Sequence, residues 1–446
     1  MSTRLFGTDG VRGQAGHPPL DAATISRLGA ALVRALPRAG EHARVVVGRD
    51  TRESGPWIER ELAHGAQAFG AHVTSAGVIP TPAVAYLTRA HGFDAGLVIS
   101  ASHNPYQDNG IKVFSGAGEK MDEDLERHIE AVIADESWSI PAGEAQSVEA
   151  PELAEAYLGH ARVALPDPGG LRGASIALDC ANGATAAVAP RLFASLGFEV
   201  HTIGCTPDGR NINRQCGSTH PEVLGEAVVE GGHRLGIAFD GDGDRAILVD
   251  ATGRIVDGDA VMLMCARHMK RRGILRGDTV VATVMSNIGL EIALRESGIA
   301  MRRTPVGDKH VAAEIAANNF SLGGEQSGHV IFADSLYTGD GIVTALNVLQ
   351  VMSETGRELA DLAGELVTYP QVLVNVRVKE KRDLAGVAVV ARTMAEVERR
   401  LAGHGRLLVR YSGTEPLLRI MLEGRDQGEI AAWAHEIAEV VRHELG

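Results

Sequence analysis

A serine and a histidine stand side by side just after a short apolar run of the chain. Residues 97–99 form that run, which predicts a buried strand, and Ser102 and His103 follow in a polar turn. Loops at strand ends often carry catalytic groups, because a rigid scaffold holds them toward a ligand. The Ser102 hydroxyl could be a nucleophile or carry a phosphoryl group, with His103 and Lys112 moving protons or offsetting anionic charge. Alternatively, Ser102 only stabilises the turn.

Three aspartates alternate with glycines after another apolar strand. They are Asp240, Asp242 and Asp244. Alternate residues of an extended chain face the same side, so these carboxylates can converge on one hard cation, and oxygen ligands favour Mg²⁺ or Ca²⁺ over zinc. An EF-hand is excluded, because Arg245 stands where that motif needs glycine and Ala251 where it needs glutamate. We expect Mg²⁺ here with Arg245 facing a phosphate, and a solvated acidic turn is the alternative.

A third polar loop lies between short apolar runs at residues 323–329. Glu325 and Ser327 offer an acceptor and a hydroxyl that suit sugar hydroxyls. His329 can bind a phosphate or exchange a proton with it. By itself, the loop is equally compatible with an ordinary polar turn.

Two further loops carry arginines that suit phosphate. Arg12 lies in a glycine-rich loop whose N–H groups could approach an anion closely. Arg410 begins a turn between two predicted strands, and Arg419 follows in the second strand. Arginine offers a bidentate fork for phosphate, and the turn adds hydroxyl and backbone donors. These donors are Ser412, Gly413 and Thr414. A plain hairpin turn is the alternative.

The elements that must position these loops alternate in type. Strand-length apolar runs at 44–50 and 95–99 are separated by segments with helical spacing, and the alternation restarts near residues 175 and 279. This pattern predicts an α/β fold with mainly parallel sheets, helices on both faces and right-handed crossovers. Asn109-Gly110 predicts a turn, and residues 184–196 predict a helix.

The C-terminal part of the chain has a different pattern. Residues 372–378 alternate as a half-exposed strand, and residues 406–411 and 417–422 also predict strands. Amphipathic segments at 389–401 and 430–441 predict helices. We therefore expect a separate, smaller α+β domain with an antiparallel sheet.

Length and composition bound the organisation of the chain. At 446 residues it exceeds what one hydrophobic core usually serves, so about three domains are expected, with two to four reasonable. Residues 136–151 are rich in Ser, Pro, Gly and Glu and lack a clear period, which predicts a first domain boundary.

The net charge argues against nucleic acid as a partner. The chain has 43 Lys and Arg against 57 Asp and Glu, a formal charge of -14. This balance opposes the run of phosphate contacts that nucleic-acid binding needs. A small anionic substrate is still compatible, because a few cations converging in one cleft can reverse the local field.

The cysteine spacing and the lengths of the apolar runs indicate the cellular location of the protein. The four cysteines are widely spaced and show no C-x-x-C motif, which excludes a zinc ribbon or a disulfide scaffold. They are Cys180, Cys205, Cys216 and Cys265. There is no signal-peptide core at the N-terminus and no run of ~18 apolar residues. We expect a cytoplasmic protein with free thiols and no membrane partner.

Taken together, four motifs resemble those of the α-D-phosphohexomutases. They are the serine loop at 100–105, the aspartate loop at 240–245, the Gly-Glu-x-Ser-Gly-His loop at 323–329 and the Arg-x-Ser-Gly-Thr-Glu-Pro turn at 410–416. They occur in the family's order across nearly the whole chain. The resemblance implies three tandem α/β domains and a smaller C-terminal domain around a central cleft, which we place at 1–150, 151–255, 256–368 and 369–446.

The resemblance also implies roles for these residues. Ser102 would carry a phosphoryl group that completes the coordination of Mg²⁺ by the three aspartates. Glu325, Ser327 and His329 would recognise the sugar, together with a second specificity loop that contains Lys309 and His310. The turn that begins at Arg410 would hold the phosphate that is not reacting.

The implied reaction exchanges a phosphate between two positions of a sugar. The form of the sugar loop with Gln326 is similar to the branch that interconverts glucosamine 6-phosphate and glucosamine 1-phosphate, through a sugar bisphosphate, for amino-sugar precursors of the cell wall. A glucose or mannose phosphate is the main alternative substrate. A phosphatase and a non-catalytic sugar-phosphate or Ca²⁺-binding protein are alternatives from other classes. For the assembly of the chain, a homodimer is an alternative to a monomer.

Overall fold

The computed structural model describes residues 5–7, 9–36, 42–143, 145, 147–401, 403–412 and 416–446. The chain forms two compact units, and the first contains Met1–Met285 and Gly298–Glu365. The second contains Ser286–Ser297 and Leu366–Gly446. Within the described residues, no helix combines the length and hydropathy that a membrane span needs.

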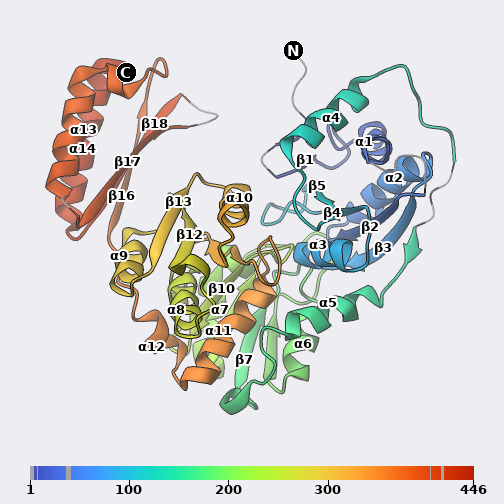
Figure 1. Cartoon of the computed structure of the whole chain (residues 1–446), viewed down its shortest axis with the longest axis horizontal. Helices are drawn as coiled ribbons and strands as arrows, with labels where there is room; N and C mark the ends of the chain where they lie inside the picture. The colour runs from blue at the N-terminus through green and yellow to red at the C-terminus, as the bar shows by residue number, and fades with distance from the viewer. Residues whose placement is uncertain are drawn as a thin grey trace. The chain divides into compact units, whose positions relative to one another are not determined.

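The first sheet delivers the serine loop (Figure 1). In spatial order its strands are β1 (Val11–Gln14), β5 (Asp108–Ser115), β4 (Ala95–Ile99), β2 (Arg44–Arg49), β3 (His72–Val78) and β6 (Val148–Glu149). The last four run parallel to one another, whereas β1 and β5 are antiparallel to their neighbours. Ser102 follows the C-terminal end of the central strand β4, where ligand crevices form in sheets of this kind.

Helices cover both faces of this sheet. They are α1 (Ala22–Ala35), α2 (Gly55–Gln67), α3 (Thr81–Ala90) and α4 (Glu123–Ala134). Val45 and Val47 of β2 share a buried core with α1, α2 and α4. Gly48, with the opposite orientation along the strand, lies against Val84 of α3. The alternation of β2 therefore buries both sides of the strand.

The second sheet delivers the aspartate loop. Its order is β11 (Ile255–Val256), β10 (Ala246–Asp250), β9 (Leu235–Phe239), β7 (Ser175–Asp179) and β8 (Glu199–Ile203). The strands β9, β7 and β8 are parallel, and β10 and β11 continue the sheet in antiparallel fashion. The accompanying helices are α5 (Leu153–Arg162), α6 (Ala189–Ser195) and α7 (Pro221–Gly231), with short 3-10 turns at Gly169–Leu171 and Gly217–Thr219. The three aspartates occupy the turn from β9 to β10.

The third sheet delivers the predicted sugar loop. Its order is β13 (Ala300–Thr304), β12 (Thr279–Thr283), β14 (Leu322–Gly324) and β15 (Val330–Phe332), and the β14–β15 pair is antiparallel. Its helices are α8 (Gly258–Arg271), α10 (Asp308–Asn318), α11 (Gly341–Thr355) and α12 (Leu359–Ala363), with a 3-10 turn at Arg276–Asp278. The loop that contains Glu325 and His329 joins β14 to β15.

The second unit is built on one antiparallel sheet. The strand order is β16 (Gln371–Arg377), β18 (Leu417–Gly424) and β17 (Gly405–Tyr411). Helices α13 (Ala388–Leu401) and α14 (Gln427–Leu445) pack against the sheet (Figure 1). The helix α9 (Ile288–Glu296) and a 3-10 turn at Leu384–Gly386 also belong to this unit. Leu418, Ile420 and Leu422 point into the core between the strands and helices. The predicted fold class of mixed α/β sheets followed by a smaller α+β part is confirmed.

Three local predictions were wrong. Arg12 does not lie in a loop but in β1, where pairing with β5 makes the backbone extended. Asn109 and Gly110 do not form a turn but lie inside β5, where they pair with Gly13 and Arg12 of β1. A Cβ at Gly110 would lie 2.6 Å from the carbonyl oxygen of Ser100, so glycine is needed there for close packing rather than for a turn. The helix predicted at residues 184–196 is shorter and begins at Ala189, because the preceding residues form turns against the aspartate loop.

Candidate active site

Ser102 meets the aspartate loop directly. Its hydroxyl donates to Asp240 Oδ2 at 2.6 Å, although the two residues are 138 positions apart in the chain. His103 Nδ1 lies 3.3 Å from the same hydroxyl oxygen. Packing between the first and second sheets thus brings the loops after β4 and β9 together, as the geometry of the predicted reaction requires.

The three aspartates form a compact oxygen cluster. One carboxylate oxygen from each of Asp240, Asp242 and Asp244 lies within 4.8 Å of the others, and all three side chains are buried. Asp242 Oδ1 and Asp244 Oδ1 are buried without a hydrogen-bond partner in the described structure. Burial raises the pKa of Asp240 well above its usual value, and the charges of Asp244 and Asp242 raise it further. Unpaired oxygens in a buried, mutually repelling cluster fit a hard divalent cation.

Glycine is required between the first two aspartates. A Cβ at Gly241 would lie 2.5 Å from the carbonyl oxygen of Ser102 and 2.8 Å from Asn213 Nδ2. The Ala184 N–H also donates to the Gly241 carbonyl at 2.8 Å. The aspartate loop is therefore packed tightly against the serine loop by its backbone.

Lys112 is the cation closest to this cluster. Its ammonium lies 2.8 Å from Asp242, 3.3 Å from Asp244 and 3.2 Å from Asp9. Burial alone would lower the pKa of Lys112, but Asp242, Asp9 and Asp244 hold it well above its usual value. Lys112 is therefore charged in this arrangement, which suits charge relief better than proton transfer.

The pKa of His103 is shifted in the opposite direction from that of Lys112. Burial lowers its pKa, and the neighbouring guanidinium groups of Arg245 and Arg12 lower it further. The imidazole is therefore neutral near pH 7 and can accept a proton. Of the two predicted proton carriers, His103 is the one whose electrostatics suit that task.

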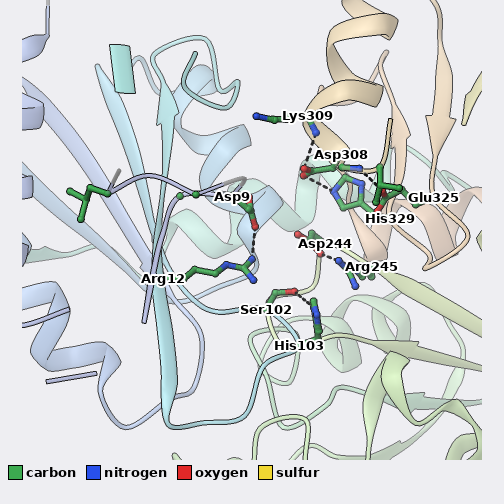
Figure 2. A pocket seen from close by; sticks show the side chains of 15 residues that line it. Asp9, Arg12, Ser102, His103, Asp244, Arg245, Asp308, Lys309, Glu325 and His329 are labelled. Carbon is green, nitrogen blue, oxygen red and sulfur yellow. Dashed lines mark hydrogen bonds and ion pairs between the residues drawn. The ribbon is translucent and has the colours of Figure 1, made fainter. Parts of the chain in front are cut away.

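A cavity of about 410 Å³ opens beside Ser102 and His103. Figure 2 shows cationic side chains around it, with carboxylates among them. The permanently charged cations are Arg12, Arg245 and Lys309, the imidazoles are those of His103 and His329, and the carboxylates are Asp9, Asp244, Asp308 and Glu325. The volume and mixed polar lining suit a small phosphorylated ligand.

Only some of the residues that we predicted to bind the sugar line this cavity. Glu325 and His329 line it, and Glu325 Oε1 accepts from the Gly307 N–H at 3.1 Å. Ser327 is exposed, with its hydroxyl 3.4 Å from Glu325 Oε2. His310 lines a neighbouring cavity of about 330 Å³, and Lys309 lines both.

A series of contacts that sequence reasoning missed joins His329, Asp308 and Asp9, which line the cavity, through Lys120. His329 contacts Asp308 at 3.4 Å, Asp308 pairs with Lys120, and Lys120 lies 2.5 Å from Asp9. Asp9 also binds Arg12 at 2.6 Å (Figure 2). Burial alone would raise the pKa of Asp9, but Lys112 and Lys120 hold it well below its usual value. Lys120 carried no motif signal, whereas Asp9 and Asp308 lie inside two loops that the sequence had singled out.

The predicted phosphate turn belongs to the second unit. Arg410 of β17 and Arg419 of β18 are directly opposite each other in the sheet register. Lys381 Nζ donates to the carbonyl of the buried Ser412 at 2.7 Å. Facing like charges are unfavourable unless an anion or a carboxylate offsets them. Gly413 and Thr414, the other predicted donors, lie outside the described residues.

A buried carboxyl near the aspartate loop should make stability depend on pH. Asp340 caps α11 by accepting from Val343 N–H, and Tyr157 donates to both of its carboxylate oxygens at 3.1 Å. Burial raises the pKa of Asp340 to about 6 from 3.8. Since the folded-state pKa is the higher one, the protonated form favours folding. The resulting stability is complete below about pH 4 and is lost as the pH rises through about 6.

We expect Asp340→Asn to remove this pH dependence, because asparagine keeps the helix cap but cannot ionise. The difference in unfolding free energy between wild type and variant should fall by at most about 3 kcal/mol from pH 4 to pH 8. Denaturant unfolding of the metal-free proteins at both pH values measures it. Asp257→Asn, at the cap of α8, is the control. A difference that does not change with pH would contradict the assignment.

Models of one protein family match four consecutive stretches of the chain. They describe alpha/beta/alpha domains I, II and III and the C-terminal domain of phosphoglucomutase/phosphomannomutase. The matched residues are 3–139, 157–253, 257–369 and 373–440. Together they span most of the chain and include all four motifs.

Curated relatives extend the similarity over the full length. A phosphoglucosamine mutase from Desulforamulus reducens is 48% identical over 444 residues, which cover 98% of this chain and 99% of the relative. A phosphoglucosamine mutase from Solibacter usitatus is 48% identical over 452 residues and covers 100% of both chains. Similarity at this level concerns the whole protein rather than one domain.

Solved structures share the fold. A phosphoglucomutase/phosphomannomutase family protein from Burkholderia thailandensis has a TM-score of 0.80 at 25% identity, covering 99% of this chain and 97% of that one. N-acetylphosphoglucosamine mutase from Aspergillus fumigatus, solved with GlcNAc-6P and magnesium, has a TM-score of 0.66 at 18% identity, covering 98% and 95%. The resemblance indicated by the motifs is confirmed, and the chain belongs to the phosphoglucomutase/phosphomannomutase family.

Proposed function

We propose that this chain is an isomerase that interconverts glucosamine 6-phosphate and glucosamine 1-phosphate through a phosphorylated Ser102. The observation that carries the proposal is the 2.6 Å contact between Ser102 Oγ and Asp240, at a buried cluster of three carboxylates and beside a cavity that Arg12, Arg245 and Lys309 line. Full-length relatives at 48% identity that are named phosphoglucosamine mutases support the choice of sugar.

In the first transfer, a sugar hydroxyl oxygen attacks the phosphorus of phospho-Ser102. A new bond forms between phosphorus and the sugar oxygen, and the bond to Ser102 Oγ breaks. His103, 3.3 Å from Oγ, accepts the proton of the attacking hydroxyl and returns one to the serine oxygen. Arg245 and the charged Lys112 offset the negative charge on the oxygens of the transferring group.

The second transfer reverses these steps with the other phosphate of the sugar bisphosphate. The intermediate must turn around, so that each phosphate in turn faces Ser102. We propose that Glu325, Ser327 and His329 hold the sugar hydroxyls, with Lys309 and His310 beside them. The phosphate that is not reacting is assigned to donors of the C-terminal unit, which are Arg410, Ser412, Gly413, Thr414 and Arg419. Arg12, which lines the cavity beside Ser102, is proposed as a further phosphate ligand.

We propose Mg²⁺ as the ion of the aspartate cluster. Its protein ligands would be carboxylate oxygens alone, two of which have no hydrogen-bond partner in the described structure, and this donor set suits magnesium. When bound, the ion supplies Lewis-acid charge to the phosphoryl oxygens. Asp240, Asp242 and Asp244 would hold it, with the phosphate of Ser102 as a further ligand.

We propose a cytoplasmic location and retain the four domains at 1–150, 151–255, 256–368 and 369–446. All four cysteines are free, and three of them are buried, which supports a reducing compartment. The placement of the first three sheets supports these boundaries, because apart from Val256 at the end of β11 each sheet is drawn from one range.

The test is a coupled assay for glucosamine 1-phosphate, started with glucosamine 6-phosphate and Mg²⁺. We expect turnover with the hexosamine phosphate to exceed turnover with glucose or mannose phosphates. Faster turnover of a glucose or mannose phosphate would show that the chain belongs to another branch of the family. Release of free phosphate without isomer would favour a phosphatase. Binding without turnover by protein phosphorylated on Ser102 would favour a non-catalytic role.

A further inference from the structure

A buried ion pair supports the serine loop from within the first sheet. Asp50 directly follows β2, and Arg52 lies two residues later. Their side chains are fully buried and form an ion pair with each other. Neither residue lines the cavity beside Ser102. Their effect on the reaction must therefore pass through the groups that they contact.

These contacts lead to the backbone on both sides of the Ser102 side chain. Ser100 Oγ donates to Asp50 Oδ2 at 2.5 Å and accepts from the Ser102 N–H at 2.9 Å. Arg52 Nη2 donates to the carbonyl oxygens of Asn104 at 2.6 Å and Ser102 at 3.2 Å. One guanidinium and one carboxylate therefore hold the peptide groups before and after the reactive side chain.

A residue from another part of the chain binds the same two carbonyls. Asn213 Nδ2 donates to the carbonyl of Ser102 at 2.8 Å and to that of Asn104 at 3.1 Å. Ser102 has a φ of 51°, in the left-handed region that residues with a Cβ seldom occupy. Such a conformation persists only where the surroundings enforce it.

The ion pair is poorly explained by stability alone. Two charges buried together must repay a large desolvation cost, so apolar residues of similar size often stabilise a fold equally well. Arginine has a geometric advantage here, because its fork can hold Asp50 on one side and two carbonyl oxygens on the other. A lysine has no such fork.

We propose that Arg52, anchored by Asp50, is a positioning residue for phosphoryl transfer, because it locks the serine loop so that Ser102 Oγ points at the aspartate cluster. This inference rests on the proposed function. Phosphoryl transfer needs the reacting atoms in line, and a displacement of about 1 Å can cost about 10²-fold in rate. Freeing the loop should therefore lower kcat while leaving the sugar-binding groups in place.

The test compares Arg52→Met with Arg49→Met. Arg49 lies at the end of the same strand and pairs with the buried Glu59 at 2.8 Å, so its loss also leaves a carboxylate unpaired. We expect Arg52→Met to lower kcat by roughly 10- to 100-fold, with KM for glucosamine 6-phosphate within about threefold of wild type. Arg49→Met should keep kcat within about threefold of wild type.

The variant Ser100→Ala tests the inference even if Arg52→Met does not fold. Amide hydrogen exchange tests it without the activity assay. Ser100→Ala removes the hydroxyl link without removing a charge, and we expect roughly a tenfold loss of kcat. Amide hydrogen exchange of residues 100–106 should be faster in Arg52→Met and Ser100→Ala than in Arg49→Met. Unchanged kcat and unchanged exchange in Ser100→Ala, or in a folded Arg52→Met, would overturn the inference. Failure of the wild type to isomerise the sugar would instead overturn the proposed function, and the exchange comparison would still stand.

Discussion

Replacing Ser102 with alanine should abolish isomerisation while leaving the fold intact. The side chain is buried against Asp240 and carries the only oxygen that we assign to the phosphoryl group, so no neighbouring residue can take over its covalent role. We expect a loss on the order of 10⁴-fold or more in kcat, as for other covalent carriers. The coupled assay with glucosamine 6-phosphate measures it.

Three controls separate loss of the carrier from loss of structure. Ser75→Ala removes another fully buried serine hydroxyl, on β3, and should keep wild-type activity. Intact-protein mass spectrometry should find one phosphoryl group on the wild type and none on Ser102→Ala. Calorimetry should show that Ser102→Ala still binds the sugar phosphate. Turnover above about one hundredth of the wild-type rate would exclude Ser102 as the carrier.

Asp242→Asn should have the second-largest effect. The change removes one of the clustered carboxylate charges but keeps an oxygen that can accept from Thr81, whose hydroxyl lies 2.5 Å from Asp242 Oδ2. A bound divalent ion contributes several kcal/mol to the transition state of phosphoryl transfer, so we expect kcat to fall by about 10³-fold. Affinity for Mg²⁺, measured by calorimetry, should fall in the same variant.

Asp250 provides the matched control for this prediction. It is buried at the end of β10, in the same sheet, but its carboxylate accepts from Thr252 and lies outside the aspartate cluster. Asp250→Asn should therefore leave Mg²⁺ affinity unchanged, whatever it does to stability. Wild-type metal affinity in Asp242→Asn would show that the cluster does not hold the ion.

The sequence by itself determined the local features of the site. Apolar runs located β4 and β9, and turn-forming residues placed Ser102 and the aspartates just beyond them, because these patterns act between near neighbours in the chain. The convergence of Asp240 and Asp244 was equally local, since both lie in the short turn from β9 to β10. Motif order was sufficient to indicate the family, which the full-length matches then confirmed.

Only the tertiary structure decided which distant groups meet. The contact of Ser102 with Asp240, the partners of Lys112 and the role of Lys120 depend on sheet order and on packing between sheets, which local patterns do not encode. Asn109-Gly110 shows the same limit, because pairing with β1 overrode its turn preference. The role of Arg52 could not be predicted from the sequence for the same reason. Its guanidinium binds the carbonyl groups of Ser102 and Asn104, which only the folded chain places beside it.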